Sequence, residues 1–526
     1  MRVLVSDALS TRGLEVLRQH PGIQADVRPK IPPEELMQVI DQYDALIVRS
    51  ATKVTADVIQ AGKQLKVIGR AGVGVDNVDV EAATAQGVVV MNTPTGNTIT
   101  TAEHSISLLL ALSKNIPQAA ASLQGGRWEK GKFLNVELYN KTLGIIGLGR
   151  IGSEVAKRAK GFAMRVIAYD PFISADVANR IGVELVDLDA LYRQADFITI
   201  HVPLGPDTHH MINRETIGLM KRGIRIINCA RGGVVDEEAL YEAMVSGHVG
   251  GAACDVFENE PSISNPLLSL ENFIGTPHLG AATAEAQENV AVAIAQQVVE
   301  YLTTGVIRNS VNTPSIEPEL LAKIQPYLTL SEKLGRLDSQ LAEGRFQEIR
   351  IAYTGEVANY DTSPLTAAVV KGVLDPITSG TINIVNAPAF ARQRGIRVVE
   401  SKSSQEENYA SLISVIIQTD RGQSHVAGTL FSRREPRVVR IDEFSLEAVP
   451  EGYLLIFSNL DVPGVIGKIG TILGQNQVNI AGMVLGREKQ GGQAVSVVNV
   501  DSPIPTPVLD QIRQMPNIVY AKVVKV

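Results

Sequence analysis

The sequence is poor in cysteine, in long apolar runs and in surplus positive charge. Its 526 residues hold two cysteines, Cys229 and Cys254, in separate strand-like segments. Two such cysteines supply neither a disulfide framework nor the paired spacing of a zinc site, so we expect a reducing, cytoplasmic setting and no metal ion. The apolar run at residues 106–112 is far shorter than the ~20 residues that cross a membrane, and the first residues lack a signal-peptide core. We therefore expect no membrane segment.

Positive charge does not dominate the chain. The 49 lysines and arginines are outnumbered by 56 acidic residues, which leaves a net charge of -7. This balance argues against a nucleic-acid partner and leaves small anionic ligands open, because a small anion needs only a local cluster of cations. Since 45% of the residues are hydrophobic, the chain has enough apolar material for roughly three to four packed domains.

Two stretches alternate short β-branched runs with helical patterns, which predicts parallel sheets with crossover helices. The expected strands are 3–5, 45–48, 67–68, 88–91, 165–169, 197–201, 225–228 and 250–255. Long helices are expected at 98–123 and at 284–302, the second about 28 Å long at 1.5 Å per residue. We expect these helices to join a domain of residues 98–282 to a domain formed by residues 1–97 and 283–312. The first would then be inserted into the second, with a cleft between them.

The last two fifths of the chain differ in pattern. The stretch "NTPSIEPELLAKIQP" is typical of a linker, and residues 316–450 mix helices with strands and a hairpin signal at "TDRGQ". This third domain shows no catalytic constellation. Its arginines suit either a second anion site or a solvated basic face, and we favour the solvated face; they are Arg392, Arg394, Arg397, Arg433, Arg434 and Arg437. Residues 452–526 alternate as βαββαβ, the ferredoxin-like pattern.

A glycine-rich turn, "GLGRIG", follows the expected strand near residue 142. In a dinucleotide-binding turn, Gly147 would allow the tight bend, Gly149 the approach of a pyrophosphate, and Gly152 close helix packing. Asp170 lies 18 positions past Gly152 at the end of a strand, where its carboxylate suits the ribose hydroxyls of NAD. The plain alternatives are an ordinary glycine turn and an aspartate that merely starts a turn before Pro171.

Three further residues suit hydride transfer from a secondary alcohol. Arg231, in "NCARGG", offers a guanidinium fork for a carboxylate. His278, in "TPHLGAAT", is the only one of eight histidines at a strand–helix junction behind a proline, and Glu260, in "DVFENEP", would raise its pKa and set its tautomer. Alone, Arg231 suits an exposed strand-end position better, and a single histidine such as His278 suits a structural role better. Together they supply the anchor, the base and the partner of the base.

These motifs, in this order and spacing, resemble the D-isomer-specific 2-hydroxyacid dehydrogenase family over about residues 1–312, and "RAGVGVDNVD" with "NTPTGNT" resembles its substrate half. The resemblance implies a Rossmann-type NAD domain inserted in a flavodoxin-like domain, with Arg231, Glu260 and His278 as catalytic residues. It implies an NAD site of Gly147, Gly149, Arg150, Ile151, Gly152, Asp170, Pro203, Cys229, Ala230, Asp255 and Gly280. It implies a substrate site of Arg49, Ser50, Arg70, Gly72, Val73 and Asn97. Lys130 and Lys132 are further candidates for an anion, although a solvated face is the favoured interpretation.

The extra domains resemble those of the long branch of this family, in which an intervening domain precedes an ACT domain. That resemblance implies NAD-dependent oxidation of D-3-phosphoglycerate at the entry to L-serine synthesis, in a homodimer or homotetramer. "SNLDVPGVIGKIG" and "VNIAGM" resemble the serine-binding loop of ACT domains, which makes Asn459, Asp461 and Asn479 the expected effector residues. The alternatives are a glyoxylate or hydroxypyruvate reductase, which leaves about 210 residues without a use, and an NAD-sensing protein of the corepressor kind.

Overall fold

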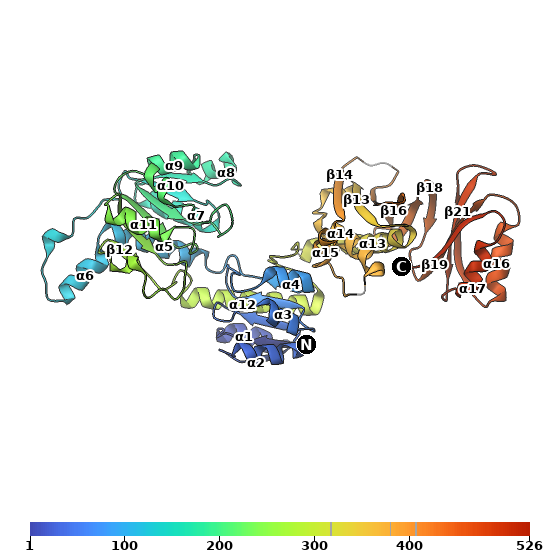
Figure 1. Ribbon diagram of the computed structural model, residues 1–526, viewed down its shortest axis with the longest axis horizontal. Coiled ribbons are helices and arrows are strands. Elements are labelled where there is room, and N and C mark those ends of the chain that lie inside the picture. Colours follow the sequence, from blue (N-terminus) through green and yellow to red (C-terminus); the bar gives the residue numbers. More distant parts are fainter. Residues whose placement is uncertain (316–317, 379, 406–407) are drawn as a thin grey trace.

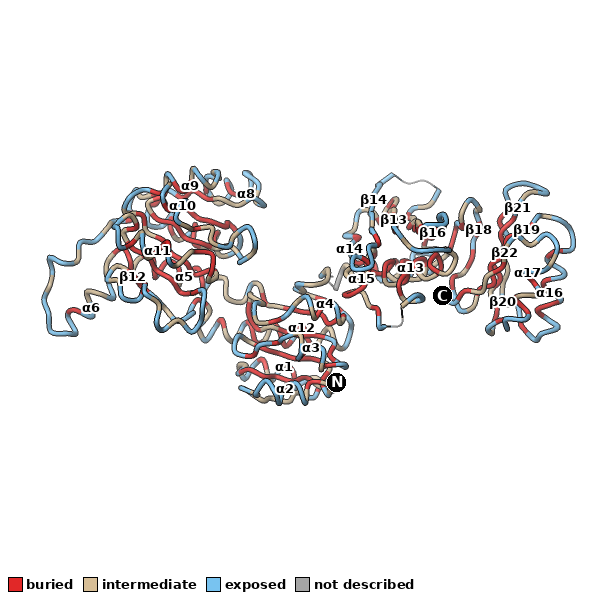
Figure 2. The backbone as a smooth tube through the Cα atoms, viewed as in Figure 1, coloured by how far each residue is buried: buried red, intermediate tan, exposed pale blue. Residues whose placement is uncertain are grey.

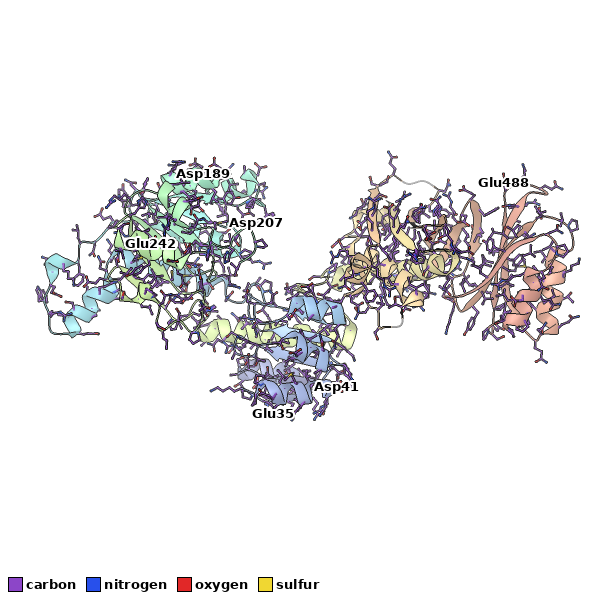
Figure 3. All side chains as sticks on the ribbon, viewed as in Figure 1. Glu35, Asp41, Asp189, Asp207, Glu242 and Glu488 are labelled. Atoms are coloured by element: carbon purple, nitrogen blue, oxygen red, sulfur yellow. The ribbon has the colours of Figure 1, made fainter. Side chains whose placement is uncertain are left out.

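The computed structural model describes residues 1–315, 318–378, 380–405 and 408–526. The chain forms four β-sheets. Figure 1 shows the blue unit that carries the N-terminus lying between the cyan-to-green part of the chain on the left and the orange-to-red part on the right. Figure 2 shows the buried residues concentrated in the sheets and in the helices that cover them. Figure 3 shows the side chains on the ribbon; of those labelled, Asp189, Glu242 and Glu488 are exposed. Within the described residues, no helix is both long and apolar enough to span a membrane.

The first unit is a five-stranded parallel sheet of order β2-β1-β3-β4-β5, the flavodoxin-like order. Its elements are β1 (Arg2–Val5), α1 (Thr11–Gln19), β2 (Gln24–Val27), α2 (Pro33–Val39), β3 (Ala45–Val48), α3 (Ala56–Ala61), β4 (Val67–Arg70), α4 (Val80–Gln86) and β5 (Val89–Met91). Helix α12 (Ala284–Thr304) returns to pack on it: a Cβ at Gly69 would stand 2.8 Å from the side chain of Ile294. The inserted-domain topology is therefore confirmed.

The inserted unit is a seven-stranded parallel sheet of order β12-β11-β10-β9-β6-β7-β8, a Rossmann-type arrangement. Its strands are β6 (Thr142–Ile146), β7 (Arg165–Tyr169), β8 (Glu184–Leu185), β9 (Phe197–Ile200), β10 (Ile224–Asn228), β11 (Val249–Cys254) and β12 (Phe273–Gly275). Its helices are α5 (Thr98–Ser113), α6 (Ile116–Gln124), α7 (Arg150–Gly161), α8 (Ala175–Arg180), α9 (Leu188–Gln194), α10 (Arg214–Leu219) and α11 (Glu237–Val245).

The expected single helix over 98–123 is wrong. Helix α5 ends at Ser113, and Asn115 takes a left-handed conformation with φ 51° before α6 begins. Asn115 tolerates this conformation better than most residues, and its amide donates to the carbonyl of Leu134 at 3.2 Å, while Pro117 suits the first turn of a new helix. Figure 1 shows α6 and the following loop projecting from the body of the domain. We call residues 114–140 the arm.

The third unit is a six-stranded mixed sheet of order β14-β13-β15-β16-β17-β18. It contains α13 (Pro318–Leu341), β13 (Phe346–Gly355), α14 (Ser363–Leu374), α15 (Ala387–Gln393), β14 (Arg397–Ser403), β15 (Ser411–Thr419), β16 (Gln423–Phe431), β17 (Glu435–Ile441) and β18 (Phe444–Ala448). The hairpin expected at "TDRGQ" joins β15 to β16. Residues 316–317 of the expected linker lie outside the described residues, and its later part already belongs to α13.

The fourth unit has the expected βαββαβ order and an antiparallel sheet of order β20-β21-β19-β22. It contains β19 (Tyr453–Leu460), α16 (Val465–Gln475), β20 (Ile480–Arg487), β21 (Gln493–Val500), α17 (Thr506–Arg513) and β22 (Ile518–Lys525). One sheet face packs under α16 and α17, and Leu454, Ile456 and Val497 of the other face join the core that contains α13. The exact limits of the four domains given above remain a prediction.

Candidate active site

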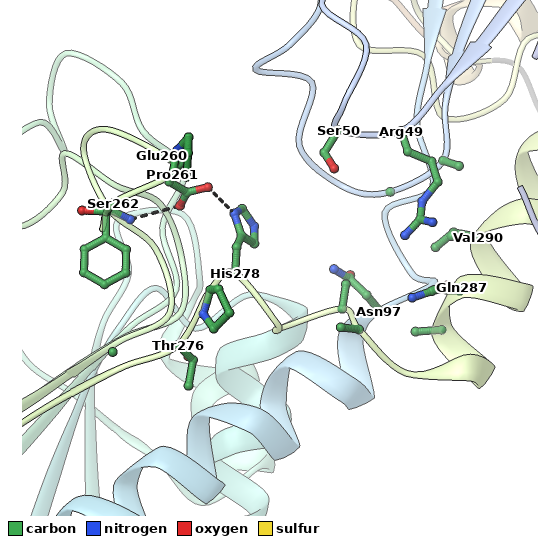
Figure 4. A pocket seen from close by; sticks show the side chains of 18 of the residues that line it. Arg49, Ser50, Asn97, Glu260, Pro261, Ser262, Thr276, His278, Gln287 and Val290 are labelled. Atoms are coloured by element: carbon green, nitrogen blue, oxygen red, sulfur yellow. Dashed lines mark hydrogen bonds and ion pairs between the residues drawn. The ribbon is translucent and has the colours of Figure 1, made fainter. Parts of the chain in front are cut away.

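The cleft between the first unit and the inserted unit holds three neighbouring cavities. The first, of about 620 Å³, is lined on one side by Arg49, Ser50, Arg70, Gly72 and Asn97, and on the other by Glu260 and His278. Figure 4 shows the His278–Glu260 pair facing Arg49 and Asn97 across this space. A second cavity, of about 670 Å³, contains Arg231, and a third, of about 230 Å³, contains Val73 and part of the expected NAD site. His278 lines all three.

The His278 imidazole is paired with a carboxylate. Its Nδ1 lies 2.8 Å from Oε2 of Glu260, while the other carboxylate oxygen of Glu260 accepts from the backbone N–H of Phe257 at 3.1 Å. The hydrogen bond to Glu260 raises the pKa of His278, against burial, which lowers it. Burial alone would raise the pKa of Glu260, but the hydrogen bonds from His278 and Phe257 lower it overall. Nε2 of His278 is then the nitrogen left to exchange a proton with a ligand.

Asp255 holds the turn that carries His278. Its carboxylate accepts from the hydroxyl of Thr276 at 2.6 Å and from the backbone N–H groups of Leu279 and Gly280 at 2.7 Å each. These bonds fasten the turn to the end of β11, and they allow His278 its left-handed φ of 55°. Asp255 also lines the smallest cavity, so its side chain borders the expected NAD site while its oxygens are used within the protein.

Arg231 follows β10 and points into the cleft. Its Nη1 donates to the carbonyl of Ala230 at 2.7 Å, and its Nε donates to Oδ2 of Asp76, in the first unit, at 3.1 Å. Gly232 allows the chain to turn here, because a Cβ would stand 1.9 Å from the carbonyl oxygen of Phe257. Sequence reasoning missed Asp76, although it lies in the "RAGVGVDNVD" motif that was singled out.

The first unit contributes two guanidinium groups. Arg49 is placed by its backbone N–H, which donates to Asp7 at 2.6 Å, and Arg70 ends β4. Burial, together with the nearby Arg231, lowers the pKa of Arg70 to about 10. Nε of Arg70, Oγ1 of Thr93 and Oδ1 of Asn97 are buried and have no hydrogen-bond partner in the described part of the chain. Such unpartnered groups favour a polar ligand. Thr93 was not among the residues expected from the sequence.

The glycine turn fits a dinucleotide. Gly147 has φ 90°, a Cβ at Gly152 would stand 2.1 Å from the carbonyl of Gly147, and the space around Gly149 is open. Among the described residues no side chain caps the start of helix α7, so its first N–H groups face this space and suit a pyrophosphate. Asp170 accepts from the N–H of Leu148 at 2.8 Å, which fastens it beside the turn. Arg150 is exposed and donates to the carbonyl of Pro94.

The rest of the expected NAD site lines the smallest cavity, namely Ile151, Pro203, Cys229, Ala230, Asp255 and Gly280. His201 lines it too, and its buried Nδ1 has no hydrogen-bond partner within the described ranges. The signal for His201 was its position at the carboxyl end of a parallel strand, where ligands of such sheets bind. The residues present therefore fit NAD.

The three expected effector residues do not come together within one chain. Asn459 pairs with Ala494 in the β19–β21 register, whereas β20 begins beside Val500, and Asn479 immediately precedes β20. Asn479 therefore lies at the opposite end of the sheet from Asn459 and its neighbour Asp461. Oδ1 of Asn459 is buried without a partner among the described residues, and Asp461 pairs with Arg487 at 3.0 Å.

The remaining candidate cations lie on the surface. Lys130 and Lys132 are exposed on the arm, where Lys132 pairs with Glu271 at 2.9 Å. In the third unit, Arg392, Arg394, Arg433 and Arg434 are exposed, and Arg397 and Arg437 pair with Glu348 and Glu435. These positions agree with solvated basic faces.

Three family models match the chain. They are the D-isomer specific 2-hydroxyacid dehydrogenase NAD binding domain at residues 106–280, the D-3-phosphoglycerate dehydrogenase intervening domain at 323–442 and the ACT domain at 453–517. A D-3-phosphoglycerate dehydrogenase of Methanocaldococcus jannaschii is 46% identical over 98% of both chains. One from Synechocystis is also 46% identical, over 100% of this chain and 94% of its own.

Solved structures match about three fifths of the chain. The TT0316 protein of Thermus thermophilus is 37% identical, with a TM-score of 0.55, and the match covers 59% of this chain and 100% of that one. A D-lactate dehydrogenase of Aquifex aeolicus, solved with NAD and lactic acid, is 28% identical, with a TM-score of 0.52 over 60% of this chain and 100% of its own.

Proposed function

This chain belongs to the D-3-phosphoglycerate dehydrogenase family, and from that premise we propose what each residue of the cleft does. The protein is an NAD-dependent D-2-hydroxyacid dehydrogenase that oxidises D-3-phosphoglycerate to 3-phosphohydroxypyruvate, the first step of L-serine biosynthesis. The observation that carries the residue assignment is the His278–Glu260 pair, which faces the guanidinium groups of Arg49 and Arg70 across one cavity.

His278 is the proton acceptor. The substrate hydroxyl gives its proton to Nε2 as the C2–O bond becomes a carbonyl, and Glu260 stabilises the imidazolium that results. Bound NAD would supply the acceptor for the hydride that leaves C2. Because Glu260 binds Nδ1, His278 keeps one tautomer and one orientation through the reaction.

Different arginines bind the two negatively charged groups of the substrate. Arg231 binds the carboxylate through its planar fork, and Arg49 and Arg70 bind the phosphate. Nε of Arg70 and Oδ1 of Asn97, which have no hydrogen-bond partner in the described part of the chain, support a polar ligand here. Gly147, Gly149, Gly152 and the start of α7 would hold the pyrophosphate of NAD, and Asp170 its adenosine ribose.

The test is turnover of the full-length protein. We expect NADH to form with D-3-phosphoglycerate and NAD, with a much lower kcat/KM for glycolate or D-glycerate, which lack the phosphate. Equal kcat/KM values for phosphorylated and unphosphorylated substrates would contradict the role of Arg49 and Arg70.

The exposed arm supports a homodimer. Its side chains include Trp128, 82% exposed, and Leu134, 90% exposed, with Ile116 and Leu123 of α6 also exposed. A projecting segment with several large apolar side chains is typical of a surface that another copy covers.

L-serine is the proposed effector. The site would form between two ACT domains, because the residues lie at opposite ends of one sheet and the edge strand β20 can pair with its counterpart. In an antiparallel pair, Asn479 of one protomer would approach Asp461 of the other. A cytosolic location is also part of the proposal, supported by two free, buried cysteines, Cys229 and Cys254.

A further inference from the structure

One carboxylate in the cleft has no part in the roles assigned so far. Asp76 lies in the loop before α4 of the first unit and reaches across to Arg231, which follows β10 of the inserted unit. Its side chain is 68% exposed. Within the described residues, the Nε–H of Arg231 is the one hydrogen-bond donor to the Asp76 carboxylate. Asp76 therefore does not cap a helix or fasten its own loop.

The neighbouring Gly74 shows how closely the two groups are fitted. A Cβ at Gly74 would stand 2.1 Å from Nη2 of Arg231 and 2.6 Å from Oδ2 of Asp76. Any other residue at this position would displace the guanidinium, the carboxylate or both. The loop of the first unit thus has a backbone shaped to receive an arginine from the other domain.

The two hydrogen bonds of Arg231 leave Nη2 and one of the two N–H groups of Nη1 without a partner among the described residues. Asp76 accepts from Nε, and the carbonyl of Ala230 accepts from Nη1. A guanidinium offers parallel pairs of N–H groups along two edges, Nε with Nη2 and Nη1 with Nη2. With Nε occupied, the Nη1–Nη2 edge is the one that can take a carboxylate in two parallel hydrogen bonds.

Among the described residues, no other carboxylate accepts a hydrogen bond from Arg231. Asp7 is buried, and its carboxylate accepts from the backbone of Arg49 and from Thr52, so it holds the loop of Arg49. Arg70 is close enough to Arg231 for the two guanidinium groups to repel each other electrostatically. An unpaired Arg231 side chain would therefore turn away from Arg70 more often.

We propose that Asp76 is a positioning residue for the reaction: from the opposite wall of the cleft it holds the Nε edge of Arg231, so that the Nη1–Nη2 edge faces the substrate carboxylate. This inference rests on the proposed role of Arg231. Because the pair is exposed to solvent, it contributes little to stability, and its effect is on how often Arg231 is aligned.

The experiment is a double-mutant cycle on the full-length protein, with kcat/KM for D-3-phosphoglycerate at saturating NAD. We expect Asp76→Ala to lower kcat/KM about two- to fivefold, mainly through KM, which is the range of an exposed ion pair. In an Arg231→Ala background, Asp76→Ala should cause no further loss, since it acts through Arg231. Asp76→Asn, whose amide oxygen still accepts from Nε, should recover part of the loss.

Two readouts separate positioning from a structural effect. The acid limb of the pH profile and the Kd for NAD should stay unchanged, because neither His278 nor the glycine turn is touched. Glu81→Ala, which removes an exposed acid from the first turn of α4, is the matched control and should leave kcat/KM unchanged. An Asp76→Ala protein with normal kcat/KM, or the same loss with and without Arg231, would overturn the inference while leaving the role of Arg231 intact. An Arg231→Ala protein with normal kcat/KM would overturn both.

Discussion

At the scale of single residues, the hydrogen bond to Glu260 makes His278 a stronger base. Oxidation requires a neutral imidazole, so kcat/KM should rise with pH through the pKa of His278, which the Glu260 hydrogen bond raises. Glu260→Gln keeps a hydrogen-bond acceptor but removes the charge, so the rising limb should move to lower pH. His278→Ala should lower kcat about 10² to 10⁴-fold with little change in NAD affinity. A pH–rate profile with its limb unmoved in Glu260→Gln would exclude Glu260 as the partner.

A second residue, Asp170, decides between NAD and NADP. Its carboxylate is fixed beside the glycine turn by the N–H groups of Leu148 and Phe172. An added 2′-phosphate would be repelled by roughly 4 kcal/mol per charge pair at about 4 Å and an effective dielectric near 20. We expect kcat/KM for NAD to exceed that for NADP by about 10²-fold or more, and Asp170→Ser to narrow the ratio. Comparable values for the two cofactors in the unaltered protein would refute this.

At the scale of elements, helix α13 carries an acid against the six-stranded sheet. Asp338 is fully buried, and within the described ranges neither carboxyl oxygen has a hydrogen-bond partner. Burial raises the pKa of Asp338 well above its usual value of 3.8; Asp442 adds to this, while the nearby Ser424 hydroxyl and the backbone of Ile417 oppose it. The folded state therefore keeps a proton that the unfolded state loses. The free energy of unfolding should then fall as the pH rises above about 3.8, until the raised pKa is passed.

Asp338→Asn should remove this dependence, because an amide of the same shape does not ionise. We expect the variant to unfold at a higher temperature than the unaltered protein at pH 8, and the difference to shrink as the pH falls toward 4. Calorimetry across this range would measure it. The control Glu447→Gln changes an exposed acid on β18 and should keep the original pH slope. The same slope in Asp338→Asn would show that Asp338 is charged in the folded protein.

At the scale of the whole molecule, the arm should decide the oligomeric state. Trp128 and Leu134 are too exposed to stabilise the isolated chain. Removing them should therefore weaken the association of subunits and leave the stability of the folded chain unchanged. Trp128→Ala with Leu134→Ser should shift the mass measured by sedimentation toward the monomer. Val245→Ser, which changes an exposed valine of α11, should not. An unchanged mass in the arm variant would place the subunit contact elsewhere.

Serine inhibition tests the pairing of whole protomers. Asn479→Ala and Asp461→Asn should each weaken inhibition by L-serine, which is moderate at most because coupling is typically 1–3 kcal/mol. If the site spans two subunits, hybrids that combine one subunit of each kind recover one intact site, and with it part of the inhibition. If the hybrids are no more sensitive to L-serine than oligomers made of either variant alone, the site lies within a single chain.

Local patterns already determined the two parallel sheets, the βαββαβ unit and the residue types of the cleft. Alternating β-branched runs are a property of neighbouring residues, and "GLGRIG" needs glycine whatever the rest of the chain does. The break at Asn115 was missed, because residues on both sides favour a helix and the contact with Leu134 comes from 19 positions away.

Tertiary structure alone decided which side chains meet. Asp76 and Arg231 are 155 positions apart, and no periodicity connects them, yet the insertion of one domain into another brings them within 3.1 Å. The setting of Asp338 was decided in the same way: its position four residues after Leu334 puts it on the apolar face of α13, but nothing along the helix shows what that face packs against. The protonation of Asp338 depends on a sheet that forms far along the chain, and the cost of burying a charge is a property of that packed environment rather than of the residue.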